Sequence, residues 1–239
     1  MRLLASGASV RGPAHQQDDS PNQDALAVSG IRGGWCVAVA DGLGSRPLSH
    51  FGSHKAVQLS RHVLRCQADI THAAVTDEVR KAWLACFGER YRLHETTCLW
   101  ARVDARGRAV AGQIGDGLLL ARSAGAFKVL TDQRQGFGNQ TLTLAQADAR
   151  NTRSFEFELS QPGDGVLLMT DGISDDLIPS QLESFFDAIY RRQLRCSSKR
   201  RMRRWLTGEL LDWSTPRHGD DKSIAGIFLR APRITRGFQ

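Results

Sequence analysis

Residues 167–177 read LLMTDGISDDL, and this segment is the most informative about the fold. Its apolar run ends at Asp171, Gly172 follows directly, and Asp175 comes four residues after Asp171. A short apolar run that stops at a glycine is typical of a buried strand. The pattern therefore predicts a carboxylate at the end of a buried strand, beside a residue that lets the chain turn.

Other aspartates stand in the same position. They are Asp41 after 35–40, Asp116 after 110–114, and the pair Asp220 and Asp221 directly before 223–229. A single Asp-Gly at a strand end is most often a turn, but four such sites in one chain are difficult to explain as turns alone. We therefore interpret these aspartates as candidates for one shared site.

Clustered carboxylates favour a metal site. A carboxylate at a buried strand end costs several kcal/mol to desolvate, on the order of 2–5, unless it is paired or bound to a cation. Carboxylates without partnering histidines suit hard cations such as Mg²⁺ or Mn²⁺ and not zinc. Two such ions about 4 Å apart activate a shared water and hold a phosphoryl group.

The periodicity predicts an α+β fold made of antiparallel sheets with helices outside. Apolar runs predict strands at 35–40, 97–103, 109–114, 118–121, 127–130, 154–159, 166–170 and 223–229. Helical spacing predicts helices through Ala56–Val63 and Val79–Phe87, and two more at 182–194 and 202–213. The glycine-rich stretch 133–140 lacks the lysine of a phosphate-binding loop, which predicts an ordinary loop.

The composition is that of one globular domain spanning residues 1–239. The N-terminus, MRLLASGASVRG, lacks the apolar segment of a secretory signal, and no stretch approaches the roughly 18 to 20 apolar residues of a membrane span. The five cysteines have no C-x-x-C spacing, so we expect reduced, mostly buried thiols and a cytoplasmic protein.

The basic charge is concentrated in one segment. Eight Lys and Arg residues and no acid lie between Arg191 and Arg204, within a basic helical segment at about 180–214. Without these eight residues the formal net charge of +7 becomes −1. Such a segment either docks an acidic phosphoprotein, nucleic acid or an anionic membrane, or is a solvated helix face. Few aromatic residues accompany it, which argues against nucleic acid.

A series of motifs resembles the metal-dependent protein phosphatases of type 2C. In order, these are PNQDA (21–25), VADGLGS (39–45), TT (96–97), IGDGLLLAR (114–122), LLMTDGISDDL (167–177) and DDKSIAGIF (220–228). Each motif alone is weak evidence, but the whole series spans about residues 6–230 in the family's order. The likeness is strongest to a short bacterial branch whose first motif runs from a histidine to Pro-x-Gln-Asp, as in His15 to Asp24.

The resemblance implies a four-layer α-β-β-α sandwich with the metals held between two central, mainly antiparallel sheets. It also implies roles for individual residues. Asp41 bridges both metals and the Gly42 carbonyl binds one; Asp171 and Asp220 complete the first metal site, and Gln23 and Asp24 lie in the segment that serves the second. Asp116 and Asp175 match ligands of a third, weaker metal, and Thr97 or Thr96 orients the site.

The chemistry implied is that of a serine/threonine phosphoprotein phosphatase, in which a metal-bridging hydroxide attacks the phosphoryl group in line. The partners implied are a phosphoprotein substrate, namely a Ser/Thr kinase or its target, within a bacterial signalling system. We expect Mn²⁺ or Mg²⁺ as cofactor and a monomer.

The sequence departs from the family pattern in several places. Gln23 replaces a charged ligand of the second metal, which predicts weaker binding there. Asp19 stands where an arginine normally grips the substrate phosphate, and His15 and Arg11 are the candidates to replace it. Leu43 occupies the position of a histidine in some eukaryotic relatives, and Asp221 replaces an asparagine and restores negative charge.

These departures leave a second hypothesis open, in which the chain is a degenerate phosphatase fold that binds phosphoproteins or scaffolds a signalling complex. Retention of the aspartates Asp41, Asp116, Asp171, Asp175 and Asp220 favours the enzyme.

His15 has two interpretations, and the simpler one is a solvated histidine of a polar loop without a function. Its place just before the metal-binding segment favours a role in the site.

Overall fold

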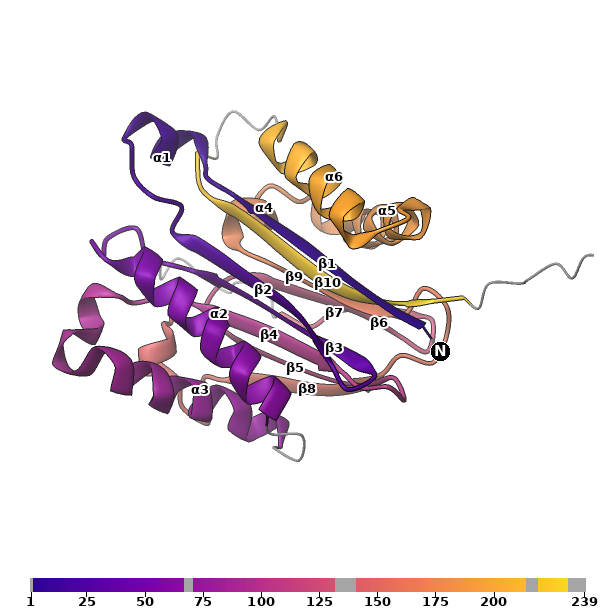
Figure 1. The fold of residues 1–239 in the computed structure, drawn as a ribbon, viewed down its shortest axis with the longest axis horizontal. Coiled ribbons are helices and arrows are strands. Elements are labelled where there is room, and N and C mark those ends of the chain that lie inside the picture. The colour runs from indigo at the N-terminus through magenta and orange to yellow at the C-terminus, as the bar shows by residue number, and fades with distance from the viewer. Residues whose placement is uncertain (1, 67–70, 132–140, 214–218, 232–239) are drawn as a thin grey trace, which may run out of the picture.

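The computed structural model describes residues 2–66, 71–131, 141–213 and 219–231. Two five-stranded sheets stack face to face between two pairs of helices, as Figure 1 shows. The order in the first sheet is β1-β10-β9-β6-β7 and in the second β2-β3-β4-β5-β8. Every strand pair is antiparallel. The architecture confirms the predicted four-layer α-β-β-α sandwich.

The first sheet consists of β1 (Arg2–Val10), β6 (Leu118–Ser123), β7 (Ala126–Val129), β9 (Gly165–Met169) and β10 (Lys222–Arg230). The second consists of β2 (Asp24–Ile31), β3 (Gly34–Asp41), β4 (Cys98–Val103), β5 (Arg108–Ile114) and β8 (Arg153–Glu158). The helices are α1 (Pro13–Gln17), α2 (Ser49–Cys66), α3 (His72–Phe87), α4 (Asp171–Ser174), α5 (Leu182–Arg195) and α6 (Lys199–Leu211). Short 3₁₀ turns lie at Gly88–Leu93, Leu144–Gln146 and Pro179–Gln181.

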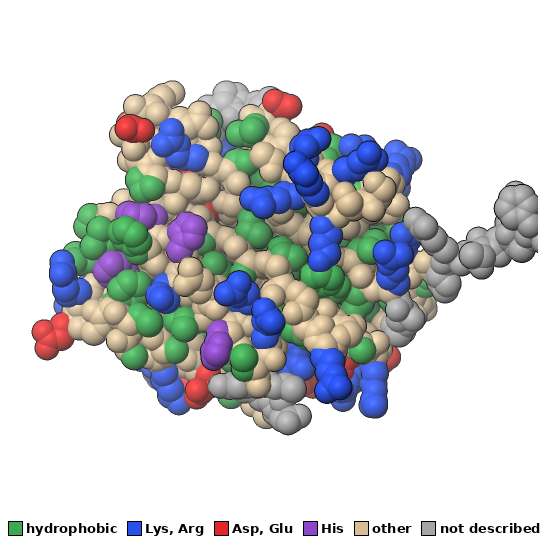
Figure 2. Space-filling model, in the orientation of Figure 1, with side chains coloured by type: hydrophobic (Ala, Val, Ile, Leu, Met, Phe, Trp, Pro, Cys, Tyr) green, Lys and Arg blue, Asp and Glu red, His purple; other side chains and the backbone are tan. Residues whose placement is uncertain are grey.

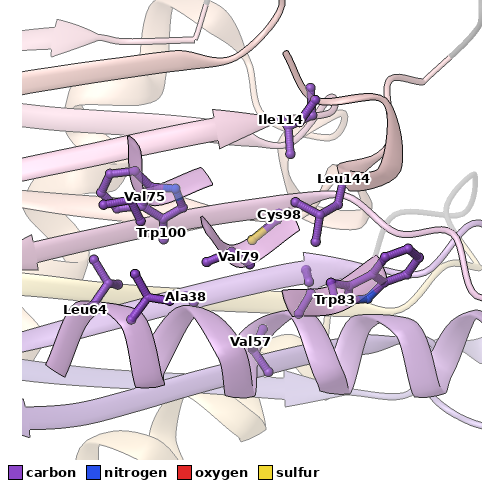
Figure 3. Packing of buried hydrophobic residues seen from close by; sticks show 14 of the residues in the cluster. Ala38, Val57, Leu64, Val75, Val79, Trp83, Cys98, Trp100, Ile114 and Leu144 are labelled. Carbon is purple, nitrogen blue, oxygen red and sulfur yellow. The ribbon is translucent and has the colours of Figure 1, made fainter. Parts of the chain in front are cut away.

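Alternation along the central strands fills the space on both sides of each sheet. In β4, Leu99 and Ala101 point into the core between the sheets, whereas Cys98 and Trp100 point toward α2 and α3. Figure 3 shows this helix-side cluster, in which Trp83 of α3 lies among the labelled apolar side chains. Because both faces are buried, the central strands appear in the sequence as continuous apolar runs.

All eight predicted strands are present within one or two residues. The four predicted helices are present as well, but α2 and α3 begin seven residues before the predicted patterns, and α6 begins three residues earlier than predicted. Strands β1 and β2 were not predicted. Their sequences, RLLASGASV and DALAVSGI, are rich in Ala, Ser and Gly, residues with weak strand propensity. Both are edge strands, and the full-length pairing of β1 with β10 holds β1 in place. The predicted loop at 133–140 lies outside the described residues.

The basic segment forms an outer layer of the sandwich. Helices α5 and α6 cover the outer face of the first sheet, with Phe186, Met202 and Leu206 buried against it. The segment is therefore one of the four layers, and its charged side chains lie on the outside of an amphipathic pair.

Two further expectations from the sequence concern the burial of the cysteines and membrane-spanning helices. Cys36 and Cys98 are buried, but Cys66 and Cys86 are exposed and Cys196 is half-buried, so the expectation of mostly buried thiols is wrong. No helix among the described residues is both long and apolar enough to cross a membrane.

Candidate metal centre

The strand ends that carry the aspartates meet at one edge of the sandwich, where α1 lies in Figure 1, and enclose a cleft of about 500 Å³. The cleft is lined by Ala14, His15, Gln23, Asp41, Gly42, Leu43, Gly44, Thr141, Asp171, Gly219 and Asp220. Carboxylate, amide and hydroxyl groups with one imidazole make up its polar side chains. No Lys or Arg is among these described lining residues.

Asp41, the last residue of β3, is held in position by two threonines. Its N–H donates to Thr97 Oγ1 at 2.9 Å, and its carbonyl accepts from the N–H of Thr97 at 2.8 Å. The Thr96 hydroxyl donates to the same carbonyl at 2.7 Å. The next peptide is fixed as well, because the N–H of Gly42 donates to the Gln23 carbonyl. Two adjacent buried threonines thus hold the backbone from which the Asp41 carboxylate projects.

Three carboxylates converge on the cleft from separate elements. Each of Asp41, Asp116 and Asp171 offers an oxygen, and these oxygens lie within 4.8 Å of one another. Asp171 begins α4 directly after β9, and Asp116 follows Gly115, whose φ of +102° favours glycine at that turn. Thr141 donates to Asp116 Oδ2 at 2.5 Å. The sequence-predicted strand-end aspartates are therefore brought together.

The electrostatics of this cluster favour a cation. Burial raises the pKa of Asp41 well above its ordinary value, and the neighbouring carboxylates of Asp24 and Asp171 raise it further. Burial also raises the pKa of Asp171 to about 6, with additional contributions from Asp116 and Asp220. Carboxylates held this close in a desolvated place either take up protons or bind a cation. Oxygen donors in this arrangement fit Mg²⁺ or Mn²⁺.

A second cluster adjoins the first and contains His15, Asp220 and Asp221, whose ligand atoms also lie within 4.8 Å of one another. His15 Nδ1 lies 2.9 Å from Asp221 Oδ2. The Asp221 carboxylate is 1% exposed and also accepts the N–H groups of Gly12 and Gln23. The sequence suggested Asp221 only as added negative charge. In the structure, its hydrogen bonds instead connect the segment that carries the first motif to the start of β10.

Gln23 and Asp24 differ in their position relative to the cleft. Gln23 lines the cleft. Asp24 is 2% exposed, is not among the cleft-lining residues, and its Oδ2 accepts the Thr170 hydroxyl at 2.7 Å. Burial raises the pKa of Asp24 well above its ordinary value, and its Oδ1 is a buried atom with no hydrogen-bond partner. A buried carboxylate oxygen in this state is consistent with a nearby cation or a bound proton.

The remaining candidates lie at the rim or away from it. Asp175 is exposed at the end of α4, where its charge helps to raise the pKa of Asp171. The Arg11 guanidinium donates to the Ser20 carbonyl and lies 3.6 Å from an oxygen of Asp19. Of the two candidates to replace the phosphate-gripping arginine, His15 therefore lines the cleft and Arg11 does not.

One hydrogen-bond network beside the cleft was not predicted from the sequence. Arg46 Nε donates to Glu95 Oε2 at 2.6 Å, and Thr143 Oγ1 lies 3.3 Å from Glu95 Oε1. The Glu95 carbonyl also accepts the N–H of Leu43 in the cleft wall. Glu95 stands directly before the two threonines, which was the one available signal of its place in the site.

Solved structures with similar folds include protein phosphatases. The Mycobacterium tuberculosis serine/threonine phosphatase PstP/Ppp superposes with a TM-score of 0.69 and 17% identity, covering 97% of this chain and 100% of that one. The PstP catalytic domain in complex with two manganese ions gives a TM-score of 0.67 at 18% identity, covering 96% and 99%. RsbX in complex with magnesium gives 0.62 at 15% identity, covering 95% of each chain.

At these identities the structural likeness shows the fold. None of the functionally curated proteins matches the sequence closely enough to count as a relative. The family model described as protein phosphatase 2C matches residues 11–211, which is most of the 239 residues. The match includes Asp41, Asp116 and Asp171. The chain therefore belongs to the protein phosphatase 2C family.

Proposed function

We propose that the protein is a metal-dependent phosphatase that hydrolyses phosphoserine and phosphothreonine in proteins. The observation that carries the proposal is the convergence of Asp41, Asp116 and Asp171 within 4.8 Å, in a cleft that Asp220 also lines. Phosphoryl transfer from a monoester needs neutralisation of oxygen charge and a positioned water nucleophile. A carboxylate cluster that binds divalent cations meets both needs.

The cations would be Mn²⁺ or Mg²⁺, two in number, with a third and weaker site. Asp41, the Gly42 carbonyl, Asp171 and Asp220 would hold the principal ions. Gln23 and Asp24 belong to the segment that serves the second ion, and Asp116 with Asp175 would serve the third. When bound, such ions supply an activated water molecule and offset the negative charge of the phosphoryl oxygens.

The protein's own groups orient the site. Thr97 and Thr96 hold the backbone of Asp41, which limits the positions open to its carboxylate. Asp221 holds His15 by Nδ1, which leaves Nε2 as the ring nitrogen available for a hydrogen bond to a phosphoryl oxygen. With Nδ1 donating to Asp221, the Nε2 of His15 can donate only when the ring carries both protons, so His15 would take the place of the missing phosphate-gripping arginine as a cationic donor.

The substrate would be a phosphoprotein, either a Ser/Thr kinase or its target, within cytoplasmic signalling. Support comes from the family and from the cleft itself, which lies at the surface where a phosphorylated side chain reaches the carboxylates without unfolding of either partner.

The test is hydrolysis of p-nitrophenyl phosphate and a phosphothreonine peptide with Mn²⁺, Mg²⁺ or no added metal. Wild type is compared with Asp41→Asn, Asp171→Asn and the matched control Asp212→Asn, whose carboxylate is exposed at the end of α6. We expect metal-dependent turnover in wild type and the control, and loss by at least about 10²-fold in the two cleft variants. Turnover that does not depend on metal would overturn the proposal.

A second candidate function is a phosphoprotein-binding or scaffold module with no turnover. It is favoured by Gln23 in place of a charged residue and by the lack of Lys or Arg among the described cleft-lining residues. The melting temperature with and without Mn²⁺ separates the two functions. A metal-induced rise that Asp171→Asn abolishes, without turnover of either substrate, identifies the scaffold.

A further inference from the structure

A second hollow of about 590 Å³ lies between helices α2 and α6, on the side of the sandwich where both sheets end. In Figure 1 the two helices border a band formed by β1 and β2. Residues 5–7 of β1 and 26–28 of β2 form its floor. We call this feature the α2–α6 groove. It shares no described lining residue with the metal-centre cleft.

Both walls of the groove carry positive charge. Lys199, Arg200 and Arg203 come from α6, and Arg61 comes from α2. None of the described residues that line the groove is acidic. Figure 2 shows Lys and Arg side chains on both sides of an apolar strip on this face. Cations on two facing walls without intervening carboxylates attract an anionic ligand and hold it between them.

Lys199 of the groove wall makes a cation–π contact with Trp35. Its ammonium lies 3.4 Å from the centroid of the Trp35 ring, and burial lowers its pKa. A cation placed over an indole is partly desolvated, and a carboxylate or phosphate beside it would strengthen the charged form. The same contact covers a face of Trp35, and no Phe, Tyr or Trp is among the described groove-lining residues. Stacking of nucleic-acid bases, which needs open aromatic faces, is therefore not what the groove offers.

The floor suits an extended polypeptide. Its side chains are mostly small, as in Ala5, Gly7 and Ala27, so a chain can approach the backbone closely. Both β1 and β2 are the outermost strands of their sheets, and edge strands are where extended peptides bind. An anionic membrane surface is flat and is met by basic groups that protrude, whereas the basic groups here line a hollow.

We propose that the α2–α6 groove binds an extended acidic peptide segment of a protein partner. Gln23 lines the metal-centre cleft and Ala27 lines the groove, and four residues of strand correspond to about 13 Å. One polypeptide can therefore occupy the groove while a residue farther along it reaches the cleft. This docking role goes beyond the proposed hydrolysis and does not require turnover.

The test is binding of a fluorescein-labelled peptide of ten glutamates, followed by fluorescence anisotropy at low salt without added divalent cation. A Gly-Ser peptide of the same length serves as the uncharged probe. The key variant is Arg200→Glu/Arg203→Glu, on the groove side of α6. Its matched control, Arg201→Glu/Arg204→Glu, changes the same charge on the same helix at exposed positions that do not line the groove.

We expect the groove variant to weaken glutamate-peptide binding about tenfold or more, and the control to change it about twofold or less. On the opposite wall, Arg61→Glu should also weaken binding, and Arg65→Glu, outside the groove on α2, should not. Melting temperatures confirm that each variant is folded. Hydrolysis of p-nitrophenyl phosphate should be unchanged in all four, so a failure of docking is distinguishable from a failure of catalysis.

Three outcomes would overturn the proposal. Equal losses in groove and control variants would mean attraction to the overall positive charge. No binding of the glutamate peptide by wild type would remove the peptide as ligand. Tighter binding of a ten-nucleotide single strand or of phosphatidylserine-containing vesicles, lost in the groove variant, would assign the groove to nucleic acid or membrane instead.

Discussion

His15 Nδ1 lies 2.9 Å from Asp221 Oδ2, and the two residues are 206 positions apart in the chain. The same carboxylate accepts the backbone N–H groups of Gly12 and Gln23. It is therefore the point at which the first motif is joined to the last. A buried carboxylate with three donors holds α1, the short helix that carries His15, at the cleft.

Replacement of Asp221 by alanine should lower the free energy of unfolding by about 2–4 kcal/mol, because the N–H groups of Gly12 and Gln23 lose their acceptor. Asp221→Asn should cost less, since one carbonyl oxygen remains. Urea denaturation measures both. A loss below about 0.5 kcal/mol for the alanine variant would mean that the carboxylate does not fasten the segment.

Thr97→Val should reduce stability by about 1–2 kcal/mol and turnover by more than stability explains, because the N–H of Asp41 loses its buried acceptor. Thr96→Val is the matched control. It removes a donor to the Asp41 carbonyl, which keeps the N–H of Thr97 as a partner, so its effect should be smaller. Thr97→Ser should restore turnover; equal effects of the two valine variants would contradict the assigned roles.

In the metal-free protein, stability should fall as pH rises from about 4 to about 6. Burial and neighbouring carboxylates raise the pKa of Asp171 from 3.8 to about 6, so the folded state binds a proton more tightly than the unfolded state. The stabilisation is present below pH 4 and is lost as pH rises through 6, with a magnitude of about 2–3 kcal/mol.

The raised pKa values of Asp41 and Asp24 act in the same direction. Melting temperatures across this pH range, with and without Mn²⁺, provide the measurement. Mn²⁺ should remove the decline, and Asp171→Asn should reduce it in the metal-free protein. A flat profile without metal would show that burial and mutual repulsion do not raise the pKa values of these carboxylates.

Two helix glycines should respond in opposite ways to alanine. A Cβ at Gly52 of α2 would lie 1.7 Å from the His94 carbonyl oxygen, and the Gly52 carbonyl accepts from Trp83 Nε1 at 3.0 Å. Gly52→Ala should therefore cost about 3 kcal/mol. A Cβ at Gly208 of α6 meets nothing within 4 Å, so Gly208→Ala should stabilise by about 0.5–1 kcal/mol. Urea denaturation of both variants checks the signs.

The sequence predicted the central strands well because both faces of each are buried and the residues are apolar throughout. It identified the edge strands β7 and β8 but missed the edge strands β1 and β2. β1 contains Ala5, Ser6 and Gly7, whose small side chains carry little strand signal, and pairing with β10 fixes its conformation. In the same way, the charge of α6 was visible in the sequence, but its position as an outer layer depends on Met202 and Leu206 packing against the first sheet.

The strand-end aspartates and the α+β class could be predicted from the sequence, because both follow from local pattern, and the repeated carboxylates predicted a metal site. The folded chain was needed to show that Asp221 supports the first motif, that His15 and not Arg11 faces the cleft, and that α2 and α6 form a basic groove. Each of these depends on which distant segments approach one another. Gly12 and Asp221, 209 residues apart, meet only because β1 and β10 pair along their whole length, and no local pattern records such a meeting.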